Sequence, residues 1–305
     1  MATRVTRSAA TAALAAAIAA PAGAAWTTVD AGRGAVTVGY PAGHVPGETA
    51  PLLVLLHGYG ASGVIEELYL GLWPWLEPEG FLYALPDGTV NPIGKRFWNA
   101  TDACCDIFGS GVDDAGYLIA LVDAIDTALG VDRHRIFFFG HSNGGFMAYR
   151  MACQHAELTA ASVSLAGATY ATAEDCAPSK ELRVLQIHGT EDASIDYDGG
   201  AILAPYPGAL ESVALWAGYA GCDEETTLDP PFDAHPEIAG DETTVLRYGL
   251  GCGAGGAELW SIVGGEHIPP FTDEFRARLR DWLVAAGNAI FADGFETGET
   301  GAWGP

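Results

Sequence analysis

Ser142 stands at the centre of the pentapeptide Gly140-His141-Ser142-Asn143-Gly144, which fits the pattern Gly-x-Ser-x-Gly. In this pattern the serine sits on a sharp turn between a strand and a helix, and the two glycines let the backbone pass where a side chain would clash. The surroundings agree, because the apolar run 136–139 comes directly before the pentapeptide and a helical segment, 146–153, comes directly after it. We therefore predict that Ser142 is a nucleophile; the alternative is a structural serine in a turn.

A nucleophilic serine needs a base to take its proton and an acid to orient that base, and behind such a turn they follow in the order serine, acid, histidine. Asp192 follows the predicted strand 183–187, and His267 follows the predicted strand 259–263 on a glycine-rich loop. The carboxyl ends of parallel strands are where such sheets place their chemistry. We predict Asp192 as the acid and His267 as the base. Three nearby acids compete with Asp192, namely Glu191, Asp196 and Asp198.

The other seven histidines are weaker candidates for the base. His57 and His188 precede glycines at strand ends and are interpreted as turn or supporting residues, and His141 is the variable residue of the serine pentapeptide. The remaining four are interpreted as exposed or loop positions: His44, His134, His155 and His235.

A tetrahedral intermediate at Ser142 would also need hydrogen-bond donors for its oxyanion. One usually comes from the residue after the serine and one from the loop after an early strand. The backbone N–H groups of Asn143 and of Tyr59, in Leu56-His57-Gly58-Tyr59-Gly60, are the natural pair. The alternative for the Tyr59 segment is an ordinary tight turn.

Short apolar runs alternate with amphipathic helices along the chain, which predicts an α/β fold with a mainly parallel central sheet flanked by helices. The predicted strands are 35–39, 52–56, 81–85, 136–139, 161–165, 183–187, 244–248 and 259–263. Apolar side chains at helical spacing predict helices over 118–129 and 272–287, and a further helix is expected over 209–219. A chain of this length can form one large core, so we predict a single catalytic domain over residues 25–288.

The two ends of the sequence differ from this pattern. Arg4 and Arg7 precede an uncharged run that ends near Ala22-Gly23-Ala24, which predicts a secretory signal peptide over residues 1–24 rather than a membrane span. Residues 289–305 are rich in Gly, Glu and Thr and are expected to form a flexible tail, either frayed or used as a sorting segment.

The chain is strongly acidic, with 39 Asp and Glu against 14 Lys and Arg and a formal net charge of −25 at pH 7. Phosphate backbones and anionic membranes should be repelled. We therefore expect no nucleic-acid partner and no membrane association, and interpret the acids as solvating the surface of an exported protein.

The six cysteines show no C-x-x-C spacing, so disulfides in an oxidising compartment are favoured over a metal site. Cys222 and Cys252 flank one predicted helix and one predicted strand, and we pair them with each other. Neighbouring Cys104 and Cys105 are expected to be poorly placed for pairing with each other, and so to share Cys153 and Cys176 in one of two ways.

Several motifs together carry a resemblance to a known family. They are Leu55-Leu56-His57-Gly58-Tyr59, Gly140-His141-Ser142-Asn143-Gly144-Gly145, His188-Gly189-Thr190-x-Asp192 with Tyr197 and Gly199-Gly200, and Gly264-Gly265-x-His267. These segments resemble the polyhydroxybutyrate depolymerase and feruloyl esterase family of the α/β-hydrolase superfamily. Cys104-Cys105 followed by Val112-Asp113-Asp114-x-Gly116-Tyr117 is similar to its feruloyl-esterase-like branch.

The resemblance implies a secreted serine esterase without metal or cofactor, and it favours Asp192 over the neighbouring acids. Expected substrates are small or oligomeric esters of the feruloyl or hydroxyalkanoate type. The alternatives are a polymer-degrading polyester hydrolase, a serine peptidase or amidase on the same fold, and an inactive binding scaffold.

The sequence departs from the family pattern at Glu266, Pro269 and Asp196, where relatives usually carry glycine, tryptophan and proline. Trp73, Trp75 and Trp98 are interpreted either as an aromatic surface near the site or as core.

Overall fold

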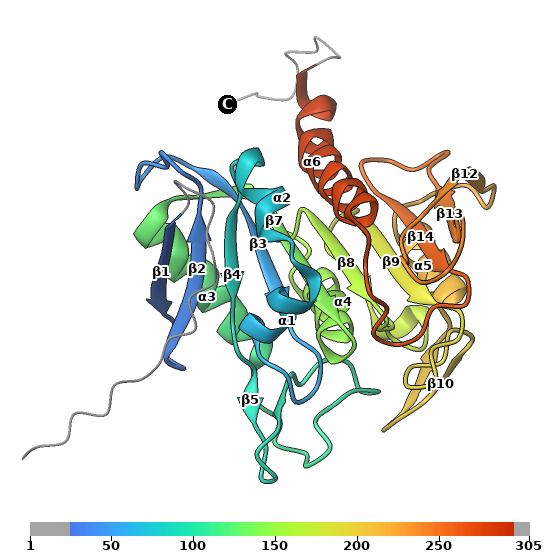
Figure 1. The fold of residues 1–305 in the computed structure, drawn as a ribbon, viewed down its shortest axis with the longest axis horizontal. Coiled ribbons are helices and arrows are strands. Elements are labelled where there is room, and N and C mark those ends of the chain that lie inside the picture. Colours follow the sequence, from blue (N-terminus) through green and yellow to red (C-terminus); the bar gives the residue numbers. More distant parts are fainter. Residues whose placement is uncertain (1–24, 296–305) are drawn as a thin grey trace, which may run out of the picture.

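The computed structural model describes residues 25–295, with side chains to residue 288. A ten-stranded sheet forms the centre of the molecule (Figure 1). Its strands, in spatial order, are β1 (Ala25–Asp30), β2 (Ala35–Tyr40), β4 (Leu82–Leu85), β3 (Ala50–Leu56), β7 (Val131–His141), β8 (Ala161–Leu165), β9 (Arg183–Gly189), β14 (Gly256–Ile262), β13 (Thr243–Tyr248) and β12 (Thr227–Phe232). From β4 to β14 each strand runs parallel to its neighbour, and the strands at both edges are antiparallel. The predicted α/β architecture is confirmed.

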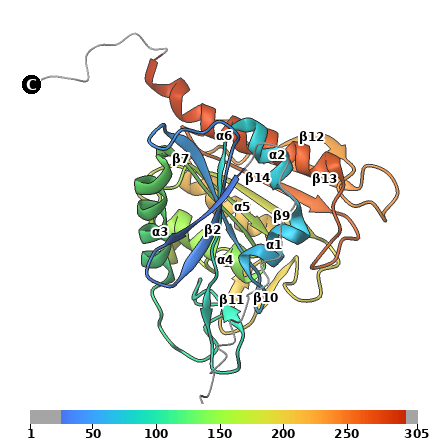
Figure 2. The same cartoon turned by 60° about the vertical axis from the view of Figure 1, so that its left-hand side comes forward.

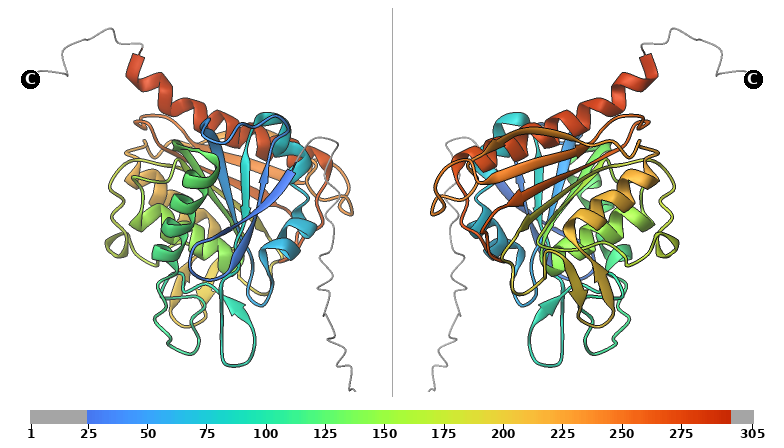
Figure 3. Two further views of the ribbon diagram at one scale, coloured as in Figure 1. Left: turned by 90° about the vertical axis from the view of Figure 1, so that its left-hand side faces the viewer. Right: turned by 90° about the vertical axis from the view of Figure 1, so that its right-hand side faces the viewer.

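Helices cover both faces of this sheet (Figures 2 and 3). They are α1 (Gly63–Leu70), α2 (Trp73–Leu76), α3 (Asp114–Leu129), α4 (Asn143–Gln154), α5 (Ala209–Tyr219) and α6 (Asp273–Phe295), with 3-10 turns at Glu77–Glu79 and Ala173–Asp175. Figure 3 shows α3, α4 and α5 on one side of the sheet and α1, α2 and α6 on the other.

Alternation along the central strands explains this two-sided burial. On β3, Leu52 and Val54 pack in the same apolar cluster as the buried face of α3, whereas Leu53 and Leu55 pack in the cluster that contains the buried residues of α6. Successive side chains of a strand point to opposite faces, so an unbroken apolar run is what a strand covered on both faces requires. All these side chains are fully buried.

Two small hairpins extend the carboxyl edge of the parallel strands. They are β5 (Thr89–Val90) with β6 (Arg96–Phe97), and β10 (Gly199–Ala201) with β11 (Pro205–Pro207). Both project at the bottom of Figure 1, on the side where the loops after β3, β7, β9 and β14 also lie.

Each strand predicted from the sequence is present, although several boundaries differ from the prediction, most of all in β7, which begins at Val131 rather than at residue 136. The proline-rich stretch 229–237, which the sequence predicts as a surface loop, begins inside β12, whose two prolines are tolerated because β12 is an edge strand. Helix α6 continues past the predicted end at Gly287 to Phe295, into the predicted tail. The predicted signal peptide and residues 296–305 lie outside the described residues.

The cysteines form three disulfides, one of which was predicted correctly. Cys222 pairs with Cys252, with Cα atoms 3.9 Å apart. The prediction was wrong for the other four, because Cys104 pairs with its neighbour Cys105, and Cys153 pairs with Cys176. The peptide bond between Cys104 and Cys105 is cis, and their Cα atoms lie 3.1 Å apart.

Within residues 25–295, no helix combines the length and the apolar character that crossing a membrane requires.

Candidate active site

Ser142 occupies a sharp turn between β7 and α4, as the pentapeptide predicts. Its backbone has φ 54° and ψ −121°, a conformation that residues other than glycine rarely adopt. The turn requires glycine at both flanking positions, because a side chain there would clash with the backbone. A Cβ on Gly140 would lie 1.9 Å from the carbonyl oxygen of Gly144, and a Cβ on Gly144 would lie 1.9 Å from the carbonyl oxygen of Leu56. The tight packing of β7, α4 and β3 therefore holds the serine in its turn.

The structure brings Ser142, His267 and Asp192 together from the ends of three parallel strands. Ser142 directly follows β7, Asp192 lies just after β9, and His267 lies on the loop after β14. The Nε2 atom of His267 is 2.9 Å from Ser142 Oγ, and its Nδ1 atom is 2.7 Å from Asp192 Oδ2. This series of two hydrogen bonds is the arrangement in which an imidazole can take a proton from the serine while the carboxylate stabilises the resulting charge.

Asp192 is distinguished from the neighbouring acids by burial and by hydrogen bonds. It is 6% exposed, whereas Glu191, Asp196 and Asp198 are all exposed. Its Oδ1 accepts from the backbone N–H groups of Ser194 and Ile195 at 2.8 and 2.9 Å. Burial by itself would raise the pKa of Asp192, but hydrogen bonds from His188, His267 and the Ile195 N–H outweigh it and hold that pKa well below its usual range.

His188 contacts the same carboxylate oxygen, Asp192 Oδ2, as His267 does. Gln186 donates from Nε2 to His188 Nδ1 at 3.0 Å, and this amide is itself oriented by Gly167 O and by the hydroxyl of Tyr149. The proton of His188 must then sit on Nε2, which lies 2.9 Å from Ile195 O and 3.3 Å from Asp192 Oδ2. The interpretation of His188 as a supporting residue agrees with this placement.

The two predicted oxyanion donors border the serine. Asn143 is the first residue of α4, so its N–H has no carbonyl partner within the helix. Its side chain is locked by Trp98, because Nδ2 donates to Trp98 O at 2.9 Å and Oδ1 accepts from Trp98 N at 2.7 Å. Tyr59 follows Gly58, where an added Cβ would lie 3.5 Å from the Cβ of Ser142.

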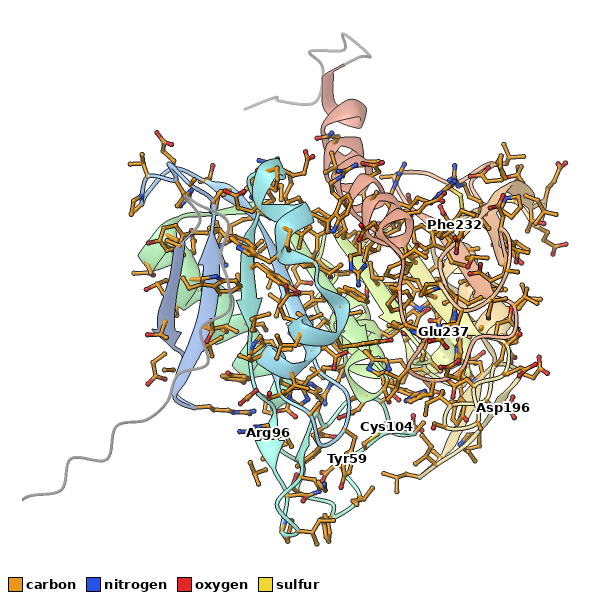
Figure 4. The ribbon with its side chains drawn as sticks, viewed as in Figure 1. Tyr59, Arg96, Cys104, Asp196, Phe232 and Glu237 are labelled. Carbon is orange, nitrogen blue, oxygen red and sulfur yellow. A yellow bond between two sulfur atoms is a disulfide. The ribbon has the colours of Figure 1, made fainter. Side chains whose placement is uncertain are left out.

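The loop that carries Trp98 is itself anchored by the Asp113-Asp114 pair that the sequence singled out. Asp113 caps α3 by accepting from Gly116 N at 2.8 Å, and the buried Asp114 accepts from Asn99 N at 2.6 Å and pairs with Arg33. Burial raises the pKa of Asp114. Cys104 lies on this loop and its Sγ is 3.7 Å from Asn143 Nδ2; Figure 4 places Cys104 and Tyr59 near each other at the carboxyl edge.

The sequence left open whether three tryptophans form an aromatic surface near the site or belong to the core. Trp73 and Trp98 are 1% and 0% exposed and belong to the core, where Trp98 donates from its indole N–H to His57 O at 3.0 Å. Trp75 is partly exposed and lies under the guanidinium of Arg280. Trp73 and Trp98 therefore form no aromatic surface beside the serine.

Two further histidines are buried close to the candidate site. His235, expected to be exposed or in a loop, lies in a loop but is only 3% exposed, and its Nε2 is 3.5 Å from Glu266 Oε2. His141, interpreted as a variable position, is 5% exposed and its ring centroid is 5.1 Å from that of His267. His141 also lies 3.1 Å from Glu66, a buried acid that the sequence analysis missed. The feature of the sequence that could have indicated a buried Glu66 is an acidic residue on the apolar side of a short helix.

Among residues 25–295, no group of three or more histidine, cysteine or acidic side chains is arranged to hold a metal ion.

The sequence is similar to one family model and to proteins named as esterases. A family model described as Phospholipase/Carboxylesterase matches residues 110–212. Feruloyl esterase B of Piromyces equi is 28% identical over 205 residues, which are 64% of this chain and 37% of that protein. A putative esterase, NocK, of Nocardia uniformis subsp. tsuyamanensis is 30% identical over 237 residues, which are 73% of this chain and 66% of that protein. The chain thus spans less than two thirds of the length of either relative.

Among solved structures, an acetyl xylan esterase from Aspergillus awamori matches with a TM-score of 0.58 and 18% sequence identity, covering 86% of this chain and 98% of that one. At this identity the likeness is one of fold. The sheet order, the serine on its turn after β7 and the family-model match agree with it. The chain therefore has the α/β-hydrolase fold.

Proposed function

We propose that this protein is a secreted serine hydrolase of carboxylic esters, in which Ser142 is the nucleophile, His267 the base and Asp192 the acid. The observation that carries the proposal is the hydrogen-bonded series from Ser142 Oγ through His267 to Asp192, at 2.9 and 2.7 Å. Two relatives named as esterases, one of them a feruloyl esterase, support the choice of an ester as substrate.

The proposed reaction has two halves. Ser142 Oγ attacks the ester carbonyl carbon as its proton passes to His267 Nε2, and the N–H groups of Asn143 and Tyr59 hold the oxyanion. The C–O bond to the alcohol then breaks, and His267 returns its proton to the departing alkoxide. Water next gives a proton to His267 and attacks the acyl carbon. The bond from that carbon to Ser142 Oγ then breaks and His267 returns the proton to Oγ, which releases the acid and restores Ser142.

We place the substrate among small or oligomeric esters of feruloyl or hydroxyalkanoate type. Support comes from the Cys104-Cys105 and Asp113-Asp114 segments, which are similar to the feruloyl-esterase-like branch, and from the relative named feruloyl esterase B. Secretion is supported by the predicted signal peptide and by three disulfides, which persist in oxidising compartments.

The experiment that tests this function compares the wild type with Ser142→Ala on a 4-nitrophenyl ester and on a 4-nitroanilide. We expect the wild type to cleave the ester much faster than the anilide, and the variant to keep its fold by circular dichroism while its activity falls below about a tenth. An alanine variant that retains most of its esterase activity would overturn the mechanism.

The same preparation tests the substrate class. Initial rates are measured at equal enzyme on ethyl ferulate, a soluble hydroxybutyrate oligomer and a polyhydroxybutyrate film. We expect the soluble esters to be cut faster; a film that clears while both soluble esters stay intact would favour the polymer-degrading alternative even if Ser142 is essential.

A further inference from the structure

A buried ion pair lies directly behind the candidate active site. Glu66, on α1, and His141, the residue before Ser142, are 3% and 5% exposed, and His141 Nδ1 is 3.1 Å from Glu66 Oε1. Two buried charged groups are expensive to desolvate, so such a pair is kept only where its remaining hydrogen-bonding atoms are also used.

The remaining atoms of the pair contact the two other loops of the site. Glu66 Oε2 accepts from the backbone N–H of Gly58 at 3.0 Å, directly before the proposed oxyanion donor Tyr59. His141 Nε2 lies 3.0 Å from the carbonyl oxygen of His267. Glu66 and His141 thus join the loop after β3, the serine turn after β7 and the loop after β14, three segments far apart in the sequence.

The partners of His141 determine its protonation. Its Nδ1 faces a carboxylate oxygen and its Nε2 faces a backbone carbonyl oxygen, and neither of these carries a proton to donate. Both contacts are favourable only if His141 carries both ring protons. Burial would lower the pKa of His141, but the neighbouring Glu66, with the carbonyl of His267 and the charge of Asp192, raises it above the ordinary value. The pair therefore consists of an imidazolium and a carboxylate.

We propose that Glu66 and His141 are positioning residues that fix the base loop and the oxyanion loop relative to Ser142. The inference rests on the proposed function. Rate depends steeply on the mutual placement of nucleophile, base and oxyanion donors, because a small displacement of any of them weakens the transition state more than substrate binding. Neither Glu66 nor His141 has a place in the proton transfers themselves.

The geometry explains why residue 66 is a carboxylate. The two oxygens of Glu66 have different partners: Oε2 accepts from Gly58 N–H, and Oε1 lies 3.1 Å from His141 Nδ1 in an ion pair. A glutamine of the same shape has one oxygen and one NH₂ group, so one of the two donors would face another donor. Glu66→Gln therefore disrupts either the oxyanion loop or His141 while changing volume very little.

The adjacent residue Glu67 supplies a matched control. It is 4% exposed on the same helix, and its carboxylate accepts from Leu72 N and Trp73 N at 3.2 and 3.0 Å and from the Tyr83 hydroxyl at 2.8 Å. These partners belong to the core beneath α1 and α2 and not to the loops of the site. Glu67→Gln has the same chemistry and similar burial, so it reports the general cost of losing a buried carboxylate in α1.

The test measures kcat and KM on 4-nitrophenyl acetate, together with urea unfolding, for the wild type, Glu66→Gln, Glu67→Gln, His141→Ala and the double variant Glu66→Gln/His141→Ala. We expect Glu66→Gln to lower kcat about tenfold or more with KM changed less than about threefold, as for interactions that act only in the transition state. Glu67→Gln should keep kcat within about threefold at a similar loss of stability. The double variant should lose clearly less than the product of the two single losses, because both residues act through one contact.

Equal kcat losses for Glu66→Gln and Glu67→Gln, or fully multiplicative losses in the double variant, would overturn the positioning role. Failure of the proposed function would look different: the wild type would then hydrolyse no ester, or Ser142→Ala would remain active, whatever the outcome at Glu66.

Discussion

Burial selects one carboxylate from four neighbouring acids after β9. Only Asp192 is withdrawn from solvent, and four donors from Ser194, Ile195, His188 and His267 surround its two oxygens. The exposed acids Glu191, Asp196 and Asp198 have the same chemistry but lack this shell. At the scale of single residues, function therefore depends less on the type of side chain than on the donors that the backbone brings to it.

Asp192→Asn is predicted to fold and to lose turnover by about a hundredfold or more, because an amide can hold His267 in the wrong tautomer. The variant also tests stability. The folded-state pKa of Asp192 is depressed, so its stabilisation is present above the unfolded pKa of about 3.9 and is lost as pH falls through the folded value.

Urea unfolding at pH 7 and at pH 3 measures how much ionised Asp192 stabilises the folded protein. The wild type should exceed Asp192→Asn in unfolding free energy at pH 7, and the difference should shrink at pH 3. A difference that stays constant with pH would contradict the assignment of ionised Asp192 as the centre of this shell.

Elements with a strong local signal were predictable from the sequence, and those that depend on distant contacts were not. Strand β3 and residues 136–139 of β7 are unbroken apolar runs, and α3 carries an apolar face with Asp113 as its cap, so both kinds of element were predicted. Edge strand β12 was missed because its two prolines normally argue against a strand.

The same distinction holds for the candidate site. Its three principal candidates could be predicted because their order along the chain and their positions at strand ends are local properties. The Glu66–His141 pair and the hydrogen bond from His188 to Asp192 arise only when α1, β7 and β9 are packed, and no sequence spacing indicates them.

The disulfides that join elements are predicted to matter for stability. Cys222–Cys252 links the end of α5 to the loop after β13 across 30 residues. Removing a cross-link over a loop of this length costs about 3.6 kcal/mol by chain entropy. We expect Cys222→Ser/Cys252→Ser to lower the unfolding free energy by about that amount while activity per folded molecule is kept, since the disulfide lies away from Ser142.

Peptide mapping under non-reducing conditions should recover Cys222 joined to Cys252 and Cys153 joined to Cys176. Mapping that joins Cys222 to another cysteine, or unchanged stability in the double serine variant, would contradict this prediction.

The whole molecule carries a formal net charge of −25, and part of that charge lies beside the candidate site. Glu191, Asp196 and Asp198 are exposed on the loops after β9, and Glu266, whose side chain is 57% exposed, directly precedes His267. Charges of one sign around a cleft alter the local concentration of charged substrates, and salt screens the effect. We expect these acids to disfavour the approach of anionic substrates.

We therefore predict that kcat/KM on an anionic ester, 4-nitrophenyl hydrogen succinate, rises several-fold when ionic strength increases from 10 to 500 mM, because the screening length falls from about 30 Å to only a few Å. The neutral ester 4-nitrophenyl acetate should change less than about twofold over the same range, since no long-range repulsion acts on it. A variant with Glu191→Gln, Asp196→Asn and Asp198→Asn keeps Asp192 and should show a weaker salt response on the anionic ester while its rate on the neutral ester is preserved. If both esters respond equally to salt, or if the triple variant retains the full response, the acids beside Asp192 do not repel the substrate.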